Sequence, residues 1–313
     1  MPRFEYIGPD SLDEALDLLA THKYDAKILA GGTDLLVRMK KGLLKPNILI
    51  SLKNLSELAY IKKEDNLIKI GAKTSIADII SSDLIKKEAR ALLQACETIG
   101  AITIQHYRGT IGGNILQDNR CHHYNQSGFH RSGRQPCHKD GGKICYARDE
   151  SDRCNSTCQS DGATALMALG ADITMARKGD ERTVDITDFY TAEGIMPFAM
   201  DSDELLKEIS IPIQGGSSAY NRLAYRSAID YPIVCAGVFL KSSNKDEIKD
   251  ARIVVGAMGR SPLFLAKASS SLIGKKLSDT AALKTASDMA MDHASTFAVH
   301  NVGATLEYRC AMV

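Results

Sequence analysis

The sequence lacks any long apolar stretch, which limits where the protein can reside. No run approaches the roughly 20 apolar residues that a membrane-spanning helix requires. The first residues, MPRFEYIGPDSLDEALDLL, carry charges where a secretory signal needs an apolar block. We therefore expect a cytoplasmic protein without a membrane span.

A strong net charge is also absent. The formal net charge is +1 over 313 residues, so no general electrostatic field draws the chain to nucleic acid or to an anionic membrane. We expect no nucleic-acid partner. The 44% hydrophobic and 25% charged residues are ordinary for a soluble globular protein, and the length suggests two or three domains or lobes.

Strand and helix signals alternate along most of the chain. Ser11, with Glu14 three residues later, predicts the start of a helix over 11–22. Apolar runs predict strands at 26–30, 47–52 and 67–72. The glycines and serines of 215–218 predict a linker, after which alternating strand and helix patterns favour a compact α+β domain.

Two Gly-Gly turns follow apolar runs, in LAGGTDLL (29–36) and GTIGGNI (109–115). Paired glycines permit positive φ angles and allow backbone N–H groups to point into one concavity, which suits a phosphate or diphosphate. Neither turn has the Walker or the Rossmann spacing. Each turn alone is also compatible with an ordinary tight turn.

The combination of motifs is more specific. AGGTDLLVRMKKG, TIGGNI, SDGATALMALGADI, YRSAIDYPIVCAGV and the final LEYRCAMV occur in this order over nearly the whole chain. This arrangement resembles the FAD-binding subunit of the molybdenum hydroxylases, a family that includes the flavoproteins of carbon monoxide dehydrogenase and xanthine dehydrogenase. The resemblance implies an α+β fold: a two-lobed FAD-binding domain over 1–214, with lobes of about 1–57 and 58–214, and a C-terminal α+β domain over 219–313.

The resemblance also implies an FAD site formed by both glycine segments and a later polar pair. Its expected residues are Leu29, Ala30, Gly31, Gly32, Thr33, Asp34, Leu35, Thr110, Ile111, Gly112, Gly113, Asn114, Ser160 and Asp161. Tyr190 or Phe198 is expected against the flavin ring.

One polar stretch, residues 118–159, interrupts the resemblance and contains most of the cysteines. Five of the eight cysteines lie in this stretch, at Cys121, Cys137, Cys145, Cys154 and Cys158. The other three stand singly at Cys96, Cys235 and Cys310, and we expect packed thiols there. Because a reducing compartment disfavours disulfides and thiolates are soft ligands, the residues suggest an iron–sulfur cluster, a zinc site, or free thiols that form a redox disulfide.

The insertion is too polar to repay its ordering entropy by apolar burial, so metal–thiolate bonds would anchor it. Seven Lys or Arg stand against five Asp or Glu between Asp118 and Cys158, an excess that would partly offset an anionic cluster. The histidines His122, His123, His130 and His138 are more typical of solvated loop residues than of ligands.

Among the flavin subunits of the family, this insertion resembles that of the 4-hydroxybenzoyl-CoA reductases, whose β subunit carries an additional [4Fe–4S] cluster. The resemblance implies Cys121, Cys137, Cys145 and Cys154 as ligands, with Cys158 as a possible replacement for Cys154. It further implies electron transfer from a reduced ferredoxin toward a [2Fe–2S] small subunit and a molybdenum-cofactor large subunit, in a dimer of heterotrimers. No catalytic residue is expected in this chain.

Two other functions remain open. One is a flavin subunit of a xanthine or CO dehydrogenase-like hydroxylase that passes electrons to NAD or another acceptor, with zinc in the insertion. The other is a flavoprotein redox sensor with switching thiols.

Overall fold

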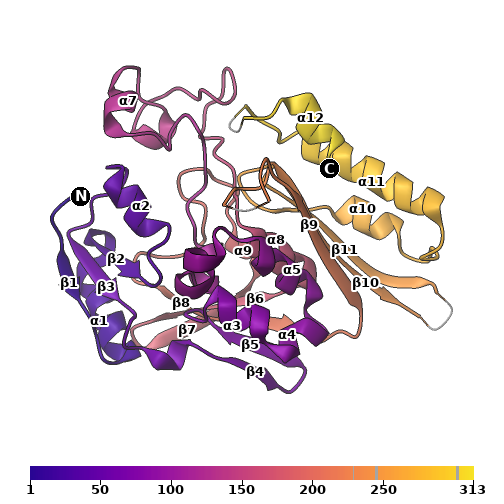
Figure 1. The fold of residues 1–313 in the computed structure, drawn as a ribbon, viewed down its shortest axis with the longest axis horizontal. Helices are drawn as coiled ribbons and strands as arrows, with labels where there is room; N and C mark the ends of the chain where they lie inside the picture. The colour runs from indigo at the N-terminus through magenta and orange to yellow at the C-terminus, as the bar shows by residue number, and fades with distance from the viewer. Residues whose placement is uncertain (228, 244–245, 301–302) are drawn as a thin grey trace.

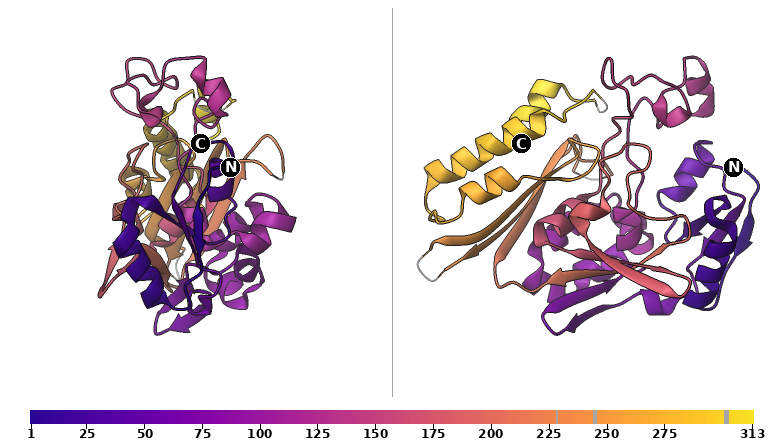
Figure 2. Two further views of the ribbon diagram at one scale, coloured as in Figure 1. Left: turned by 90° about the vertical axis from the view of Figure 1, so that its left-hand side faces the viewer. Right: turned by 180° about the vertical axis from the view of Figure 1, so that it is seen from behind.

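The computed structural model describes residues 1–227, 229–243, 246–300 and 303–313, so Ala228, in the segment 225–238, lies outside the described residues. Three β-sheets organise the chain, as Figure 1 shows. The views in Figure 2 show the N-terminal lobe and the C-terminal unit at opposite ends, with the five-stranded sheet between them. The expected α+β class is confirmed.

The N-terminal lobe has a parallel sheet in the order β1-β3-β2. Its main elements are β1 (Glu5–Ile7), α1 (Leu12–His22), β2 (Ala26–Leu29), α2 (Leu35–Lys40) and β3 (Ile48–Ser51). At the start of α1, the Ser11 hydroxyl accepts a hydrogen bond from Glu14 N, and Glu14 in turn accepts one from Asp10 N. The predicted cap is therefore confirmed, with its reciprocal bond one residue earlier than in a standard capping box.

The second lobe has a five-stranded sheet in the order β4-β5-β8-β6-β7. Its strands are β4 (Ile61–Glu64), β5 (Leu67–Gly71), β6 (Asp172–Arg177), β7 (Asp180–Asp185) and β8 (Leu205–Pro212). Its helices are α3 (Ile76–Ser81), α4 (Asp83–Glu88), α5 (Arg90–Thr98), the π-helical turn η3 (Ile102–His106), α6 (Ile111–Ile115), α8 (Asp161–Leu169) and α9 (Ile186–Phe189).

The C-terminal unit packs three helices against an antiparallel sheet in the order β12-β11-β10-β9. These elements are β9 (Ser217–Leu223), β10 (Val234–Ser242), β11 (Ile248–Gly256), β12 (Leu263–Phe264), α10 (Ala266–Ser271), α11 (Thr280–Ser295) and α12 (Leu306–Ala311). Small residues on α11 (Ala286, Ala290 and Ala294) are buried against the sheet.

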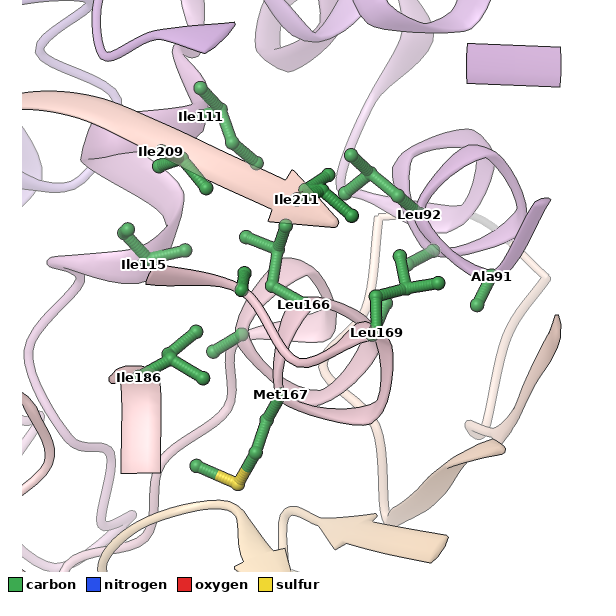
Figure 3. Close-up of a cluster of buried hydrophobic side chains, with 14 of the residues drawn as sticks. Ala91, Leu92, Ile111, Ile115, Leu166, Met167, Leu169, Ile186, Ile209 and Ile211 are labelled. Carbon is green, nitrogen blue, oxygen red and sulfur yellow. The ribbon is translucent and has the colours of Figure 1, made fainter. Parts of the chain in front are cut away.

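Helix α8 occupies the centre of the molecule, and each of its nine residues is buried. A helix that is apolar on all sides is typical of a position between two layers, and α8 contacts both β8 and the C-terminal strands. Figure 3 shows Leu166 and Met167 of α8 in the same cluster as Ile209 of β8. At Gly237 of β10, a Cβ would lie 2.9 Å from Thr164 O, so glycine permits this close packing.

The insertion lies between α6 and α8 in the chain. It contains α7 (Gly128–Ser132) and the short helix η4 (His138–Asp140), and projects from the sheets in Figures 1 and 2. Arg120 and Thr157 close its base with two backbone hydrogen bonds of 2.8 Å. Further out, Lys41 Nζ donates to Asn125 O at 2.9 Å, and His300 N donates to Ala147 O at 3.0 Å. The insertion thus contacts both the N-terminal lobe and the C-terminal unit.

In the described part of the chain, none of the helices combines the length and the apolar character needed to cross a bilayer.

Candidate functional site

A cavity of about 450 Å³ lies between the two N-terminal lobes. We call it the glycine-loop cavity, because Ala30–Leu35 and the segment 110–113 contribute to its wall. Lys27 and Arg38 add cationic groups, and residues 195–206 close another side. Nine of the fourteen predicted FAD-site residues line it: Ala30, Gly31, Gly32, Thr33, Asp34, Leu35, Thr110, Gly112 and Gly113.

The first glycine turn lies directly on the second. A Cβ on Gly31 would come within 1.7 Å of Arg108 O, so only glycine allows this approach. Gly32 has φ +73°, where side chains are strained. Among the described residues, no protein acceptor is assigned to the backbone N–H groups of 31–33. These groups and the Arg38 guanidinium form the kind of donor set that suits a diphosphate.

The second glycine turn uses its backbone N–H groups within the protein. Ile111 N donates to Thr74 O at 3.0 Å, and Gly112 N donates to Ala72 O at 2.9 Å. Gly113 N donates to the Thr110 hydroxyl at 3.1 Å. The turn therefore gives the cavity a smooth glycine surface and one hydroxyl, while the Ile111 side chain is buried in the core shown in Figure 3.

Four of the other predicted residues lie behind the cavity wall. Leu29 packs beneath Gly32. Asn114 Oδ1 accepts hydrogen bonds from the Ser160 hydroxyl at 2.8 Å and from Gly162 N at 3.1 Å, which joins α6 to the start of α8. Asp161 lies deeper still.

Asp161 connects α8 to the C-terminal sheet. It accepts hydrogen bonds from Tyr220 at 2.5 Å and from Arg222 at 3.2 Å. Burial raises the pKa of the Asp161 carboxyl, and the Arg222 charge opposes this effect. Neither Ser160 nor Asp161 is among the residues that line the glycine-loop cavity.

The two aromatic candidates differ in exposure to the cavity. Phe198 lines it and stacks on Phe189 with ring centres 5.5 Å apart. Tyr190 is buried, and its hydroxyl donates to Ile115 O at 2.8 Å. Asp230 Oδ1 accepts a hydrogen bond from Tyr231 N at 3.0 Å.

A second, small cavity of about 20 Å³ lies inside the insertion, and we call it the cysteine cavity. The residues around it come from the whole length of the insertion, which folds back on itself. They are Cys121, His123, Tyr124, Cys137, His138, Lys139, Ile144, Cys145, Tyr146, Cys154, Asn155 and Ser156. All four predicted metal-ligand cysteines are therefore brought to one place.

The surroundings of these thiols are partly polar. Asn155 Nδ2 donates to Cys145 Sγ at 3.4 Å, and the Cys154 thiol donates to the Ser156 hydroxyl at 3.3 Å. Burial, together with the nearby Cys154 and Cys145, raises the pKa of Cys121 to about 11. Deprotonation of the Cys121 thiol near neutral pH therefore requires a compensating positive charge, such as a metal.

The thiols do not converge on a single point. Within the described ranges, no three His, Cys, Asp or Glu side chains are close enough together to bind one metal ion. A single zinc needs its ligands at about 2.3 Å, whereas each thiolate of a cubane binds a different iron and stands farther from the others. Around the cysteine cavity, the described side chains therefore line one common space without forming a group that could hold a single metal ion.

Cys158 is separate from this group. It is buried in the main core, and its backbone N donates to Gly259 O at 3.0 Å. Cys96 and Cys235 are buried as expected, and Cys310 is half-buried. All eight cysteines are free thiols.

A charged network links the two cavities, and the sequence did not predict it. Asp34 pairs with Arg120, and Arg38 lies 3.1 Å from Asp118 Oδ2. Lys139 Nζ, from the insertion, lies 2.8 Å from Asp118 Oδ1. The high Lys and Arg content of the insertion was visible in the sequence, but the partners of these side chains were not.

Comparison with known proteins identifies the fold family. Residues 2–214 match the model of the FAD binding domain in molybdopterin dehydrogenase, and residues 218–313 match the CO dehydrogenase flavoprotein C-terminal domain. The chain belongs to the flavoprotein subunits of the molybdopterin dehydrogenases. The predicted family and the requirement for FAD are thereby confirmed, and the chain is an oxidoreductase subunit.

Several relatives are similar over most of their length. The nicotinate dehydrogenase FAD-subunit of Eubacterium barkeri is 29% identical, over 88% of this chain and 82% of the relative. The carbon monoxide dehydrogenase medium chain of Hydrogenophaga pseudoflava is 28% identical, over 93% of this chain and 86% of the relative. The solved structure of reconstituted CO dehydrogenase from Oligotropha carboxidovorans superimposes with a TM-score of 0.80 at 27% identity, covering 100% of this chain and 94% of that chain.

Proposed function

We propose that this flavoprotein is the FAD and [4Fe–4S] electron-transfer subunit of a molybdenum-dependent 4-hydroxybenzoyl-CoA reductase. The observation that carries the proposal is the cysteine cavity, where Cys121, Cys137, Cys145 and Cys154 meet beside the FAD-binding domain. The spacing of these cysteines resembles that of the additional cluster in this group of reductases.

The proposed FAD site is the glycine-loop cavity. The N–H groups of 31–33 and the Arg38 guanidinium would hold the diphosphate, and the Thr110 hydroxyl and Phe198 would contact other parts of the cofactor. Leu29, Ile111, Asn114, Ser160 and Asp161 would support this wall from behind. Bound FAD supplies chemistry that exchanges one or two electrons.

The proposed cluster ligands are the four thiols of the cysteine cavity. Cys154 is preferred to Cys158, because Cys158 packs in the main core and is not among the residues that line this cavity. The hydrogen bond from Asn155 to Cys145 is of the kind that tunes cluster potential.

The proposed assembly places the substrate chemistry in other chains. The relatives are named as a FAD-subunit and a medium chain, which supports a complex with a molybdenum-cofactor large subunit and a [2Fe–2S] small subunit. We propose a cytoplasmic dimer of such heterotrimers with reduced ferredoxin as electron donor. The domain bounds 1–214 and 219–313, with the insertion at 118–159, belong to the same proposal.

A second function is favoured by the named relatives. Because a nicotinate dehydrogenase subunit and CO dehydrogenase medium chains resemble this chain, it could serve a hydroxylase that delivers electrons to NAD or another acceptor. In that case the insertion would bind zinc.

The metal content distinguishes these functions. After anaerobic purification of the full chain, we expect about one FAD, four irons and four acid-labile sulfides per polypeptide. Zinc without iron would favour the second function, and thiols that titrate freely with no bound metal would favour a redox sensor.

A pair of variants tests the ligand set. Cys154→Ala is expected to lose iron and keep FAD, whereas Cys158→Ala is expected to keep both, because its thiol packs in the core. Iron retained in Cys154→Ala, or lost in a folded Cys158→Ala, would contradict the proposed ligands.

A further inference from the structure

Lys139, on η4, lines the cysteine cavity and contacts Asp118, a residue of the glycine-loop cavity. Its side chain is only 5% exposed, and it lines the cysteine cavity together with Cys137 and Cys154. Its ammonium group lies 2.8 Å from Asp118 Oδ1, and Asp118 lines the glycine-loop cavity. The structure therefore holds a buried cation between the two proposed redox sites.

Three further contacts fix the position of this ammonium group. It donates to Gly194 O at 2.9 Å, to Asn119 O at 3.1 Å and to the Ser156 hydroxyl at 3.4 Å. Gly194 is also close to the thiols, because a Cβ on it would lie 2.8 Å from Cys154 Sγ. The Lys139 ammonium is thus held beside the segment that carries a proposed ligand, with little freedom to move away.

The charges around Lys139 do not cancel. Asp118 faces two cations, Lys139 and Arg38, while Asp34 pairs with Arg120. Within this network three cations stand against two anions. All five side chains are largely buried, at 5–19% exposed, so solvent and salt screen the excess positive charge less than at the surface.

We propose that Lys139 raises the reduction potential of the iron–sulfur cluster by its charge, without being a ligand. The inference rests on the proposed function. Reduction adds one electron to a cluster that its four thiolates already make anionic, and the donor is oxidised by one electron, with no bond made or broken. A buried cation beside the thiolates favours the more negative, reduced state. Lys139 thereby makes the cluster easier for a ferredoxin-type donor to reduce.

The test compares variants that change charge in opposite directions. Electron paramagnetic resonance of the reduced cluster is followed at controlled potentials in the full chain, with dithionite as reductant. At the wild-type midpoint, Lys139→Met is expected to lower the ratio of reduced to oxidised cluster at least tenfold, which is a shift of at least 59 mV for one electron. Asp118→Asn removes the opposing carboxylate and is expected to raise that ratio.

Two further variants serve as controls. Lys143→Met removes the same formal charge from an exposed position in the same insertion, and water is expected to screen its effect to well below that of Lys139→Met. Lys139→Arg keeps the charge and is expected to keep a potential close to that of the wild type.

Each outcome bears on the inference. A Lys139→Met chain with full iron content and an unchanged potential would overturn it. If Lys139→Met fails to retain its cluster, Asp118→Asn provides the decisive measurement. A midpoint potential of Asp118→Asn at or below the wild-type value would also overturn the inference. Wild-type protein that contains no iron would instead refute the proposed function.

Discussion

At the residue scale, the glycine-loop cavity depends on the absence of one side chain. Gly31 allows the first turn to rest on the Arg108 carbonyl, directly before the second turn. The contact joins two segments from different lobes beside residues 31–33, whose N–H groups we propose as diphosphate donors. A backbone-to-backbone contact of this kind leaves no flexible side chain that could move aside.

We predict that Gly31→Ala weakens FAD binding. The added Cβ would lie 1.7 Å from Arg108 O, so the turn must shift, and strain of this kind typically costs about 1–3 kcal/mol. FAD content after purification and the midpoint of urea unfolding measure the effect. Gly8→Ala is the matched control in the same lobe, because its nearest contact would be an ordinary 3.8 Å to Tyr6. Equal FAD content in the two variants would contradict the assigned role of Gly31.

At the element scale, a buried carboxylate holds the segment that closes the glycine-loop cavity. Glu204, just before β8, is paired with Arg182 of β7 at 2.5 Å and accepts a hydrogen bond from Asp201 N at 2.7 Å. Arg182 also donates to Ala199 O at 2.7 Å. These bonds fix residues 199–204 to the five-stranded sheet beside the cavity.

The Glu204 interaction predicts a pH dependence. The hydrogen bond from Arg182 lowers the pKa of Glu204 below its ordinary 4.5. A carboxyl whose pKa is lower in the folded state stabilises that state at pH values above its unfolded-state pKa. This contribution is lost as the pH falls through the folded-state pKa. We expect Glu204→Gln to lower the free energy of unfolding by roughly 2 kcal/mol at pH 7, and by less to the extent that solvent screens Arg182. The variant is also expected to show a flatter decline in stability below pH 5.

Urea unfolding of the FAD-loaded chain between pH 7 and pH 4 measures this dependence. The control is Glu64→Gln, since Lys62 and Lys69 also lower the pKa of Glu64, but in full solvent. If Glu64→Gln and Glu204→Gln changed the pH profile equally, the role of the buried pair would be refuted.

The elements also show what the sequence can and cannot predict. The strands expected at 26–30, 47–52 and 67–72 and the Ser11 cap depend on local patterns, and these predictions are confirmed. By contrast, α4 and α5 are separated at Ala89, which has φ −136° and ψ 53°, although the apolar pattern around it is helical. The strand β4 was not predicted, because its pattern IKKE is mostly exposed and lacks apolar alternation. The Asp34–Arg120 and Asp118–Lys139 pairs join residues whose proximity depends on the tertiary fold, so local patterns could not reveal them.

At the scale of the whole molecule, the insertion is attached by few apolar contacts. Its small hydrophobic cluster has Cys121, Tyr124 and Ala147 packed against Val299 of the C-terminal unit. A segment this polar has little core of its own, so its order should depend on metal–thiolate bonds. The body beneath has a large core that includes α8 and does not require them.

We predict that removal of the proposed cluster loosens the insertion and leaves the rest of the chain folded. Trypsin is expected to cut after Lys143 and Arg148, both exposed in the insertion, at least tenfold faster once iron has been removed with an oxidant and a chelator. Cleavage after Lys178, at the β6–β7 turn, is the internal control and should keep its rate, as should the retention of FAD. Mass spectrometry of timed digests measures both sites in one sample. If Lys143 is cut equally fast with and without iron, protein contacts alone order the insertion; if Lys178 accelerates as well, the cluster stabilises the whole chain.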